Sequence, residues 1–297
     1  MNEDYLWNRS GAPDPEIQEL ERTLAPLRYR GRQQHWWRTP LPRVAAAVLA
    51  VAAISWFQLA RPVPRITPWR QGATPLAAGQ VVRTGASETF LQSADIGRVE
   101  LGPESELRVA TGRKLLLERG MLHAFIWAPP REFVVDTPSA RAVDLGCAYT
   151  LNVDSDGNGV LRVEAGWVAF QFDGHESFIP AGAECVTRKR RGPGIPFYRD
   201  APLRTALAAF EGGDCSALPA VLRAARPQDG LSLWHLLTRV PPQYRAAVFE
   251  RFAELLPVPA RVTRKAVLRG DPHALDLCWN ALNLENTSWW RGWERAW

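Results

Sequence analysis

One stretch of seventeen uncharged residues, 44–60, constrains this chain more than any other feature. Its sequence is VAAAVLAVAAISWFQLA, in which only Ser55 and Gln58 are polar, and Arg43 and Arg61 bracket it. Seventeen helical residues extend roughly 25 Å, the short limit for crossing the hydrocarbon core of a bilayer. The pattern therefore predicts a single transmembrane helix over residues 44–60.

Aromatic residues near both ends of this stretch fit the same interpretation. Trp36 and Trp37 precede it and Trp56 and Phe57 lie near its end, as in the aromatic belts at membrane interfaces. A buried helix of a soluble domain is disfavoured because the stretch has no polar face. A cleaved signal peptide is disfavoured because more than forty residues precede the apolar run.

Arginine counts on the two sides of the stretch predict its orientation. Five arginines lie within about twenty residues before it and three within a shorter distance after it: Arg28, Arg30, Arg32, Arg38 and Arg43, then Arg61, Arg65 and Arg70. The excess places the N-terminus in the cytoplasm. We therefore expect a bacterial inner-membrane protein whose C-terminal domains are periplasmic.

The N-terminal segment, residues 1–43, is too short to build its own core. Asp14, Pro15 and Glu16 form a strong helix start, with a capping residue, proline at the first helical position and an acid in the first turn. Apolar residues follow at helical spacing, and we predict them to bind a partner: Ile17, Leu20, Leu24 and Leu27. The alternative is a helix that lies on the membrane or is partly disordered.

The pattern changes after a linker at 61–76. Residues 77–187 contain short alternating apolar runs separated by Gly, Pro and Asp-Gly turns, as in CAYTLNV (147–153) and GVLRVEAGWVAFQF (159–172). No long helical period interrupts them, so the segment predicts an all-β fold, either solenoid-like or a sandwich. Alternating residues are expected to fill its core: Val134, Val143, Leu145, Leu151, Val153, Leu161 and Val163.

Five motifs in this region resemble those of the FecR family. In order they are GQVVRTG (79–85), GRVELGPESELRV (97–109), REFVVDTPSARAVDLGCAYTLNV (131–153), VLRVEAGWVAF (160–170) and IPAGAEC (179–185). The resemblance implies a β-rich, solenoid-like periplasmic domain in an anti-sigma-like regulator. Cys147 and Tyr149 stand where the family commonly has Thr and Phe, and the N-terminal segment is shorter than the family's helical anti-sigma region.

Two smaller features of the β region leave alternatives open. Residues 154–159 match the first half of an EF-hand loop, but Ala165 stands where the bidentate Glu would be, so a hairpin turn is favoured over a calcium site. The cysteines, none in a C-x-x-C pair, are either buried free thiols or partners in one or two disulfides: Cys147, Cys185, Cys215 and Cys278.

The remaining chain is predicted to be a basic linker, 188–200, followed by a helical domain, 201–297. The linker contains the run Arg188 to Arg191, expected to be solvated and near lipid headgroups. About six helices with protein-binding surfaces are expected next. The Trp-rich tail SWWRGWERAW (288–297) is either a packed last helix or an interfacial anchor.

These observations predict a membrane-anchored FecR-domain regulator that transduces a signal through protein contacts. The alternative is a cell-envelope scaffold or ligand-binding protein without a signalling role. Expected partners are the inner membrane, a cytoplasmic sigma factor or other regulator, and a periplasmic or outer-membrane protein. A net charge of +5 with scattered arginines disfavours nucleic acid. No motif predicts an enzyme, a cofactor or a metal site.

Overall fold

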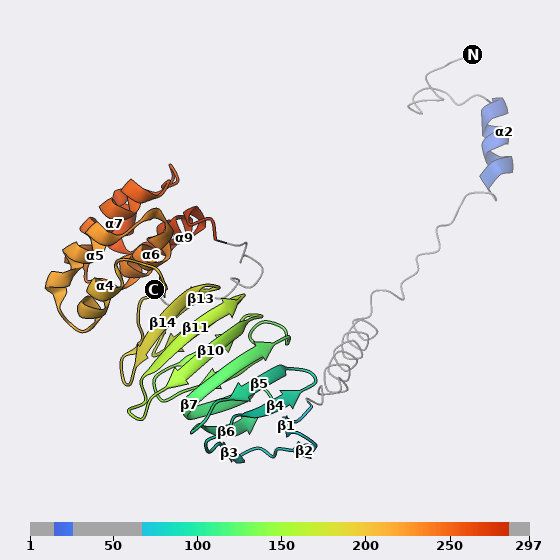
Figure 1. Cartoon of the computed structure of the whole chain (residues 1–297). Helices are drawn as coiled ribbons and strands as arrows, with labels where there is room; N and C mark the ends of the chain where they lie inside the picture. The colour runs from blue at the N-terminus through green and yellow to red at the C-terminus, as the bar shows by residue number, and fades with distance from the viewer. Residues whose placement is uncertain (1–14, 26–66, 285–297) are drawn as a thin grey trace. The chain divides into compact units, whose positions relative to one another are not determined.

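A computed structural model describes residues 15–25 and 67–284 of the chain (Figure 1). The chain divides into two compact units, 1–64 and 65–297, and each is considered by itself. In the first unit the described element is helix α2, Pro15–Leu24. Within the described ranges no helix combines the length and apolarity needed to span a membrane, and the predicted span 44–60 lies outside those ranges.

The second unit begins with sixteen strands. They are β1 (Arg70–Gln71), β2 (Thr74–Pro75), β3 (Val81–Arg83), β4 (Thr89–Ser93), β5 (Gly97–Leu101), β6 (Glu106–Thr111), β7 (Lys114–Ile126), β8 (Val134–Asp136), β9 (Arg141–Asp144), β10 (Ala148–Val153), β11 (Gly159–Ala165), β12 (Trp167–Phe172), β13 (His175–Pro180), β14 (Ala183–Arg188), β15 (Gly192–Pro193) and β16 (Phe197–Tyr198). The all-β prediction for this region is confirmed.

The strands form two layers that share the long strand β7. Sheet A contains β1, β2, β4, β5, β10, β11, β14, β15 and β16 with the second half of β7; sheet B contains β3, β6, β8, β9, β12 and β13 with its first half. All described strand pairs are antiparallel except β7–β8. This antiparallel pairing favours the sandwich over a parallel solenoid.

Gly120 lies where β7 passes from sheet B to sheet A. Its φ is +94°, and a Cβ at this position would lie 2.2 Å from Oγ of Ser105. Gly166 is similarly constrained, because its φ is +69° and a Cβ would lie 1.9 Å from the carbonyl oxygen of Gly146. Only glycine combines these dihedrals with such close backbone approach. The change of layer and the β11–β12 turn therefore both depend on glycine.

The core lies between the two layers and follows the predicted alternation. Six of the seven core residues predicted from sequence are buried: Val143, Leu145, Leu151, Val153, Leu161 and Val163. The prediction for Val134 is corrected, because it is only half-buried while Val135 is 0% exposed. Side chains alternate between faces along a strand, so the inward position in β8 belongs to Val135.

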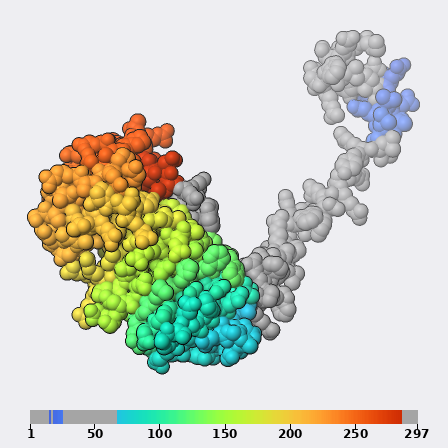
Figure 2. Space-filling view, in the orientation of Figure 1, coloured from blue at the N-terminus to red at the C-terminus, as the bar shows by residue number. Residues whose placement is uncertain are grey.

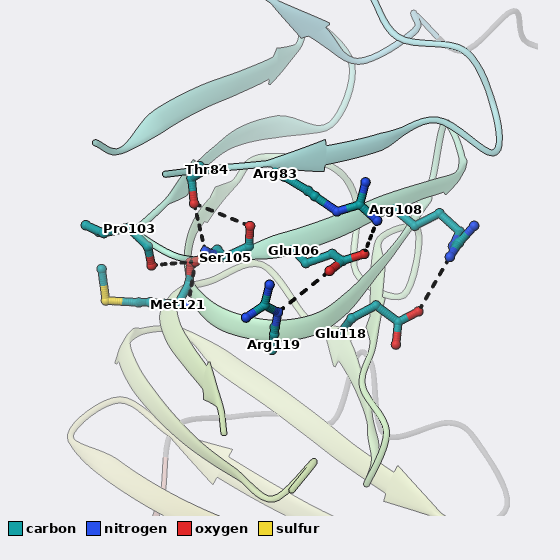
Figure 3. Close-up of polar contacts among 9 residues, drawn as sticks. All are labelled: Arg83, Thr84, Pro103, Ser105, Glu106, Arg108, Glu118, Arg119 and Met121. Atoms are coloured by element: carbon teal, nitrogen blue, oxygen red, sulfur yellow. Dashed lines mark hydrogen bonds and ion pairs between the residues drawn. The ribbon is translucent and has the colours of Figure 1, made fainter. Parts of the chain in front are cut away.

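Two of the FecR-like motifs meet through polar contacts at one edge of the sandwich (Figure 3). Oγ1 of Thr84 donates to the carbonyl oxygen of Gly102 at 2.7 Å and accepts from the backbone N–H of Ser105 at 2.7 Å. Oγ of Ser105 in turn accepts from the backbone N–H of Met121 at 2.9 Å. The motif residues therefore hold the β5–β6 turn against β3 and β7.

Six α-helices follow within residues 67–284, in agreement with the predicted number of about six. They are α4 (Arg204–Glu211), α5 (Leu218–Ala224), α6 (Gly230–Arg239), α7 (Pro242–Leu255), α8 (Arg264–Arg269) and α9 (Pro272–Ala281), with 3₁₀ turns at Cys215–Ala217 and Pro227–Asp229. They gather at the β13–β14 end of the strands, and Figure 2 shows them continuous with the strands in one body. The tail, 285–297, lies outside the described residues.

The helices and the sheets share one hydrophobic core rather than forming separate cores. A buried aromatic cluster joins them, and it consists of Trp167, Phe178, Trp234, His235 and Trp279. The ring centroid of Trp279 lies 4.6 Å from that of Trp234, 5.5 Å from Phe178 and 6.0 Å from Trp167. The boundary predicted at residue 201 is therefore a change of secondary structure within one packed unit.

The two predicted linkers differ from the structure. In the 61–76 segment, β1 and β2 pair with the sheet and Trp69 is 0% exposed. In the 188–200 segment, β15 and β16 pair with β14, and Ile195 and Phe197 are buried. Two-residue strands have too few side chains to show alternation, and backbone pairing alone creates them.

The open alternatives for the cysteines and for residues 154–159 have structural answers. All four cysteines are free thiols, three of them buried and Cys215 exposed. The 154–159 segment is a tight turn in which Oδ1 of Asp154 accepts from the backbone N–H groups of Asp156 at 2.9 Å and Asn158 at 2.8 Å. These bonds occupy the carboxylate within its own turn, as the hairpin interpretation predicts.

Candidate functional site

Helix α2 contains the residues predicted from sequence to bind a partner. Its residues are mostly good helix formers, with Pro15 at the start, Glu16 in the first turn and Arg22 in the last turn, where the charges suit the helix dipole. Oγ1 of Thr23 donates to the carbonyl oxygen of Glu19 at 2.9 Å. The predicted helix start is therefore confirmed by the observed one.

Two of the four predicted site residues have described side chains, and both are exposed. Leu20 is 61% exposed and Leu24 is 50% exposed, one helical turn apart on the same face. Ile17 lies in the same helix, while its side chain, like the whole of Leu27, lies outside the description. The structure thus brings Leu20 and Leu24 together as an exposed stripe.

The length of α2 matters for what this stripe can do. Ten residues make a helix of about 15 Å, and isolated helices of fewer than about twelve residues are marginal in water. Exposed leucines add no packing energy to it. A helix of this kind gains stability when its apolar face enters a groove or an interface. The stripe is therefore suited to binding.

A second candidate site lies on sheet B, where sequence analysis predicted nothing. It is a pocket of about 650 Å³ between the β8–β9 and β12–β13 turns. Its lining residues are Leu116, Arg131, Asp136, Thr137, Ala140, Arg141 and the run Gln171 to Glu176. Its volume is typical of pockets that bind small molecules.

Asp136 is the most constrained charge in this pocket. Its carboxylate accepts from Nε of Arg141 at 2.8 Å and pairs with Nζ of Lys114 at 2.5 Å. Burial alone would raise the pKa of Asp136, but the bonds from Arg141 and Lys114 outweigh it and lower that pKa. Asp136 is therefore ionised at neutral pH and holds Arg141 at the pocket wall.

The pocket suits a small polar ligand that carries both donors and acceptors, rather than a ligand with a single sign of charge. Its walls combine the cations of Arg131 and Arg141 with the carboxylates of Asp136, Asp173 and Glu176. Oγ1 of Thr137 accepts from the backbone N–H of Ala140 at 3.0 Å and shapes the turn beside it. The signal available in the sequence is the Asp-Thr-Pro run at 136–138, which indicates a turn and by itself does not indicate a pocket.

Comparisons with known proteins find only a limited structural similarity. No protein-family model and no curated protein matches the chain. Two crystal structures, at 1.65 and 2.50 Å, of a candidate anti-sigma factor from Parabacteroides distasonis share 16% identity with it, with TM-scores of 0.36 and 0.35. Each match covers 43% of this chain and 64% of the other, so the chain spans less than two thirds of their length. The resemblance to the FecR family stays a prediction from sequence.

Proposed function

We propose that the chain is a single-pass regulator of the bacterial inner membrane that acts through protein contacts and not by catalysis. In this proposal the N-terminus is cytoplasmic, residues 44–60 cross the bilayer and the sandwich with its helices is periplasmic. The five FecR-like motifs and the uncharged stretch support it. Helix α2 would bind a cytoplasmic sigma factor or a similar regulator.

The observation that carries the proposal is the exposed stripe of Leu20 and Leu24 on α2. At helical spacing, Glu16 and Glu21 border this stripe on its two sides. An amphipathic helix with acidic edges fits an apolar groove whose rim is basic. The partner surface is therefore expected to combine aliphatic residues with Lys or Arg.

A matched pair of substitutions in the full chain tests this function. Leu20→Asp places a carboxylate on the stripe, and Gln18→Asp places one on the opposite face of the same helix. We expect Leu20→Asp to abolish co-purification of a sigma factor from detergent-solubilised membranes and to change transcription from its promoters, while Gln18→Asp leaves both unchanged. Equal capture and equal transcription for the two variants would contradict the regulator proposal.

The pocket on sheet B favours a second candidate function, a ligand-binding envelope protein without a signalling role. Arg141→Ala would remove one wall cation and one of the two cationic partners of Asp136. If small-molecule binding depends on Arg141 while α2 variants leave transcription unchanged, this second function is the correct one. If both sites matter, the pocket is the sensing site of the regulator.

A further inference from the structure

Exposed large apolar side chains occur in only two places in the described ranges. Two are the leucines of α2, and the other three are Phe90, 39% exposed, Phe125, 57% exposed, and Trp127, 47% exposed. These three come from β4, from β7 and from the residue after β7 ends. Scattered surface apolar residues are ordinary, whereas a cluster of exposed aromatic rings marks an interaction surface.

Strand register brings these rings onto one face of sheet A. Arg98 on β5 is the cross-strand partner of Phe125, and its guanidinium carbon lies 4.3 Å from the ring centroid of Phe90. The centroids of Phe125 and Trp127 are 6.3 Å apart. We refer to Phe90, Arg98, Phe125 and Trp127 as the aromatic patch. Figure 1 shows β4, β5 and β7 side by side at the end of the sandwich away from the helices.

The patch is built rigidly although it is exposed. Nε1 of Trp127 donates to the carbonyl oxygen of Ala94 at 2.8 Å. The backbone N–H of Trp127 donates to the carbonyl oxygen of Ile96 at 3.0 Å. The indole is therefore held against the β4–β5 turn with its polar atom satisfied. A ring fixed in this way loses little conformational entropy when it binds.

The same β4–β5 turn receives the chain where it enters this unit. The backbone N–H of Thr67 donates to Oδ2 of Asp95 at 2.7 Å, and Oγ of Ser93 donates to the carbonyl oxygen of Thr67 at 2.9 Å. Only six residues, 61–66, separate Thr67 from the end of the predicted span. At full extension they allow about 25 Å.

We propose that the aromatic patch docks on the surface of the bilayer that anchors the chain, with its rings at the headgroup boundary and Arg98 beside lipid phosphate. The inference rests on the proposed membrane anchor and adds an orientation to it. The short connection keeps the β4–β5 turn near the lipid. The effective concentration of lipid at the aromatic patch is therefore high, and a low intrinsic affinity is sufficient for docking. Trp and Phe rings with an adjacent Arg suit this boundary.

Site-specific photocrosslinking in the full chain tests the docking. In the test variant, benzoylphenylalanine replaces Phe125. In the control variant it replaces Asp156, which lies in the exposed β10–β11 turn at the other end of β10. The chain is reconstituted in phosphatidylcholine–phosphatidylglycerol vesicles, irradiated and analysed by mass spectrometry. We expect lipid adducts from position 125 and no lipid adducts from position 156.

Three outcomes would overturn the docking. Protein adducts without lipid adducts at position 125 would assign the patch to a protein partner. Absence of adducts at position 125 in vesicle-bound chain would contradict the docking while leaving the anchor intact. Recovery of the chain in the soluble fraction would remove the anchor, and with it both the proposed location and this inference. Fractionation before irradiation separates the last two results.

Discussion

The two aromatic groups of the second unit use the same kinds of side chain for opposite purposes. In the buried aromatic cluster, Trp234 is 0% exposed and Trp279 is 3% exposed, packed between sheet and helices. In the aromatic patch, Phe125 and Trp127 remain about half exposed on sheet A. The difference teaches that a second layer, and not residue type, decides whether an aromatic ring stabilises the fold or is available for binding.

Removing a ring from the buried cluster should have the largest effect. We expect Trp279→Ala to lower the free energy of unfolding by about 3–5 kcal/mol, because it leaves a cavity where the rings of Trp167, Phe178 and Trp234 meet. Urea denaturation of residues 65–297, which contain the whole core, measures it. A loss below about 1 kcal/mol would show that this cluster, too, is peripheral.

Arg239 on α6 tests the polar side of the same junction. Its Nη1 donates to the carbonyl oxygens of Pro193 at 2.9 Å and Gly194 at 2.8 Å, and its Nη2 donates to that of Glu176 at 2.8 Å. Arg239→Met removes all three of these hydrogen bonds from a charged donor, so we expect a loss of about 2–3 kcal/mol. Arg239→Lys should recover only part of it, because a single ammonium group cannot reach every acceptor. Equal stability of Met and Lys variants would contradict this explanation.

Asp144, at the end of β9, makes the stability of the region beside Trp167 depend on pH. Burial raises its pKa from the ordinary 3.8 to about 7, although bonds from Sγ of Cys147 and the backbone N–H of Gly146 act in the opposite direction. Between these two pH values the folded chain holds a proton that the unfolded chain has lost. Stability from this group is therefore highest near pH 4 and falls as the pH rises through 7.

Asp144→Asn should remove that dependence. The amide resembles the protonated carboxyl, so we expect the stability of the variant relative to the original chain to rise by roughly 1–3 kcal/mol between pH 5 and pH 8. Urea denaturation of residues 65–297 at the two pH values checks the sign. A relative stability that instead falls over this range would show that the ionised carboxylate is itself stabilising.

The smallest effect is expected in the aromatic patch. Phe125→Ala removes a ring that is 57% exposed, so the free energy of unfolding should change by less than about 0.5 kcal/mol. The contrast with Trp279→Ala under identical conditions is the sharpest form of the comparison. A loss of 2 kcal/mol or more, of the size usual for buried rings, would make Phe125 a structural residue and weaken the docking proposal.

Much of the β region was predictable because alternation along a strand is a local property. The runs around Leu151 and Leu161 identified both strands and their inward faces. The polar pocket was missed because Asp136, Arg141 and Glu176 come from three strands, and only the pairing of those strands brings the charges together. The stripe of α2 was found because Leu20 and Leu24 are four residues apart on one helix.

The sequence by itself determined the order of structural types along the second unit, the helix start at Pro15 and the run of short helices described after residue 201. These depend on capping, turn residues and periodicity, which act over a few positions. Tertiary structure alone decided that residues 192–198 join the sheet, that helices and strands share one core, and that Phe90 lies beside Arg98 and Phe125. Backbone hydrogen bonds between distant segments and burial between layers determine such contacts, and neither leaves a local pattern in the sequence.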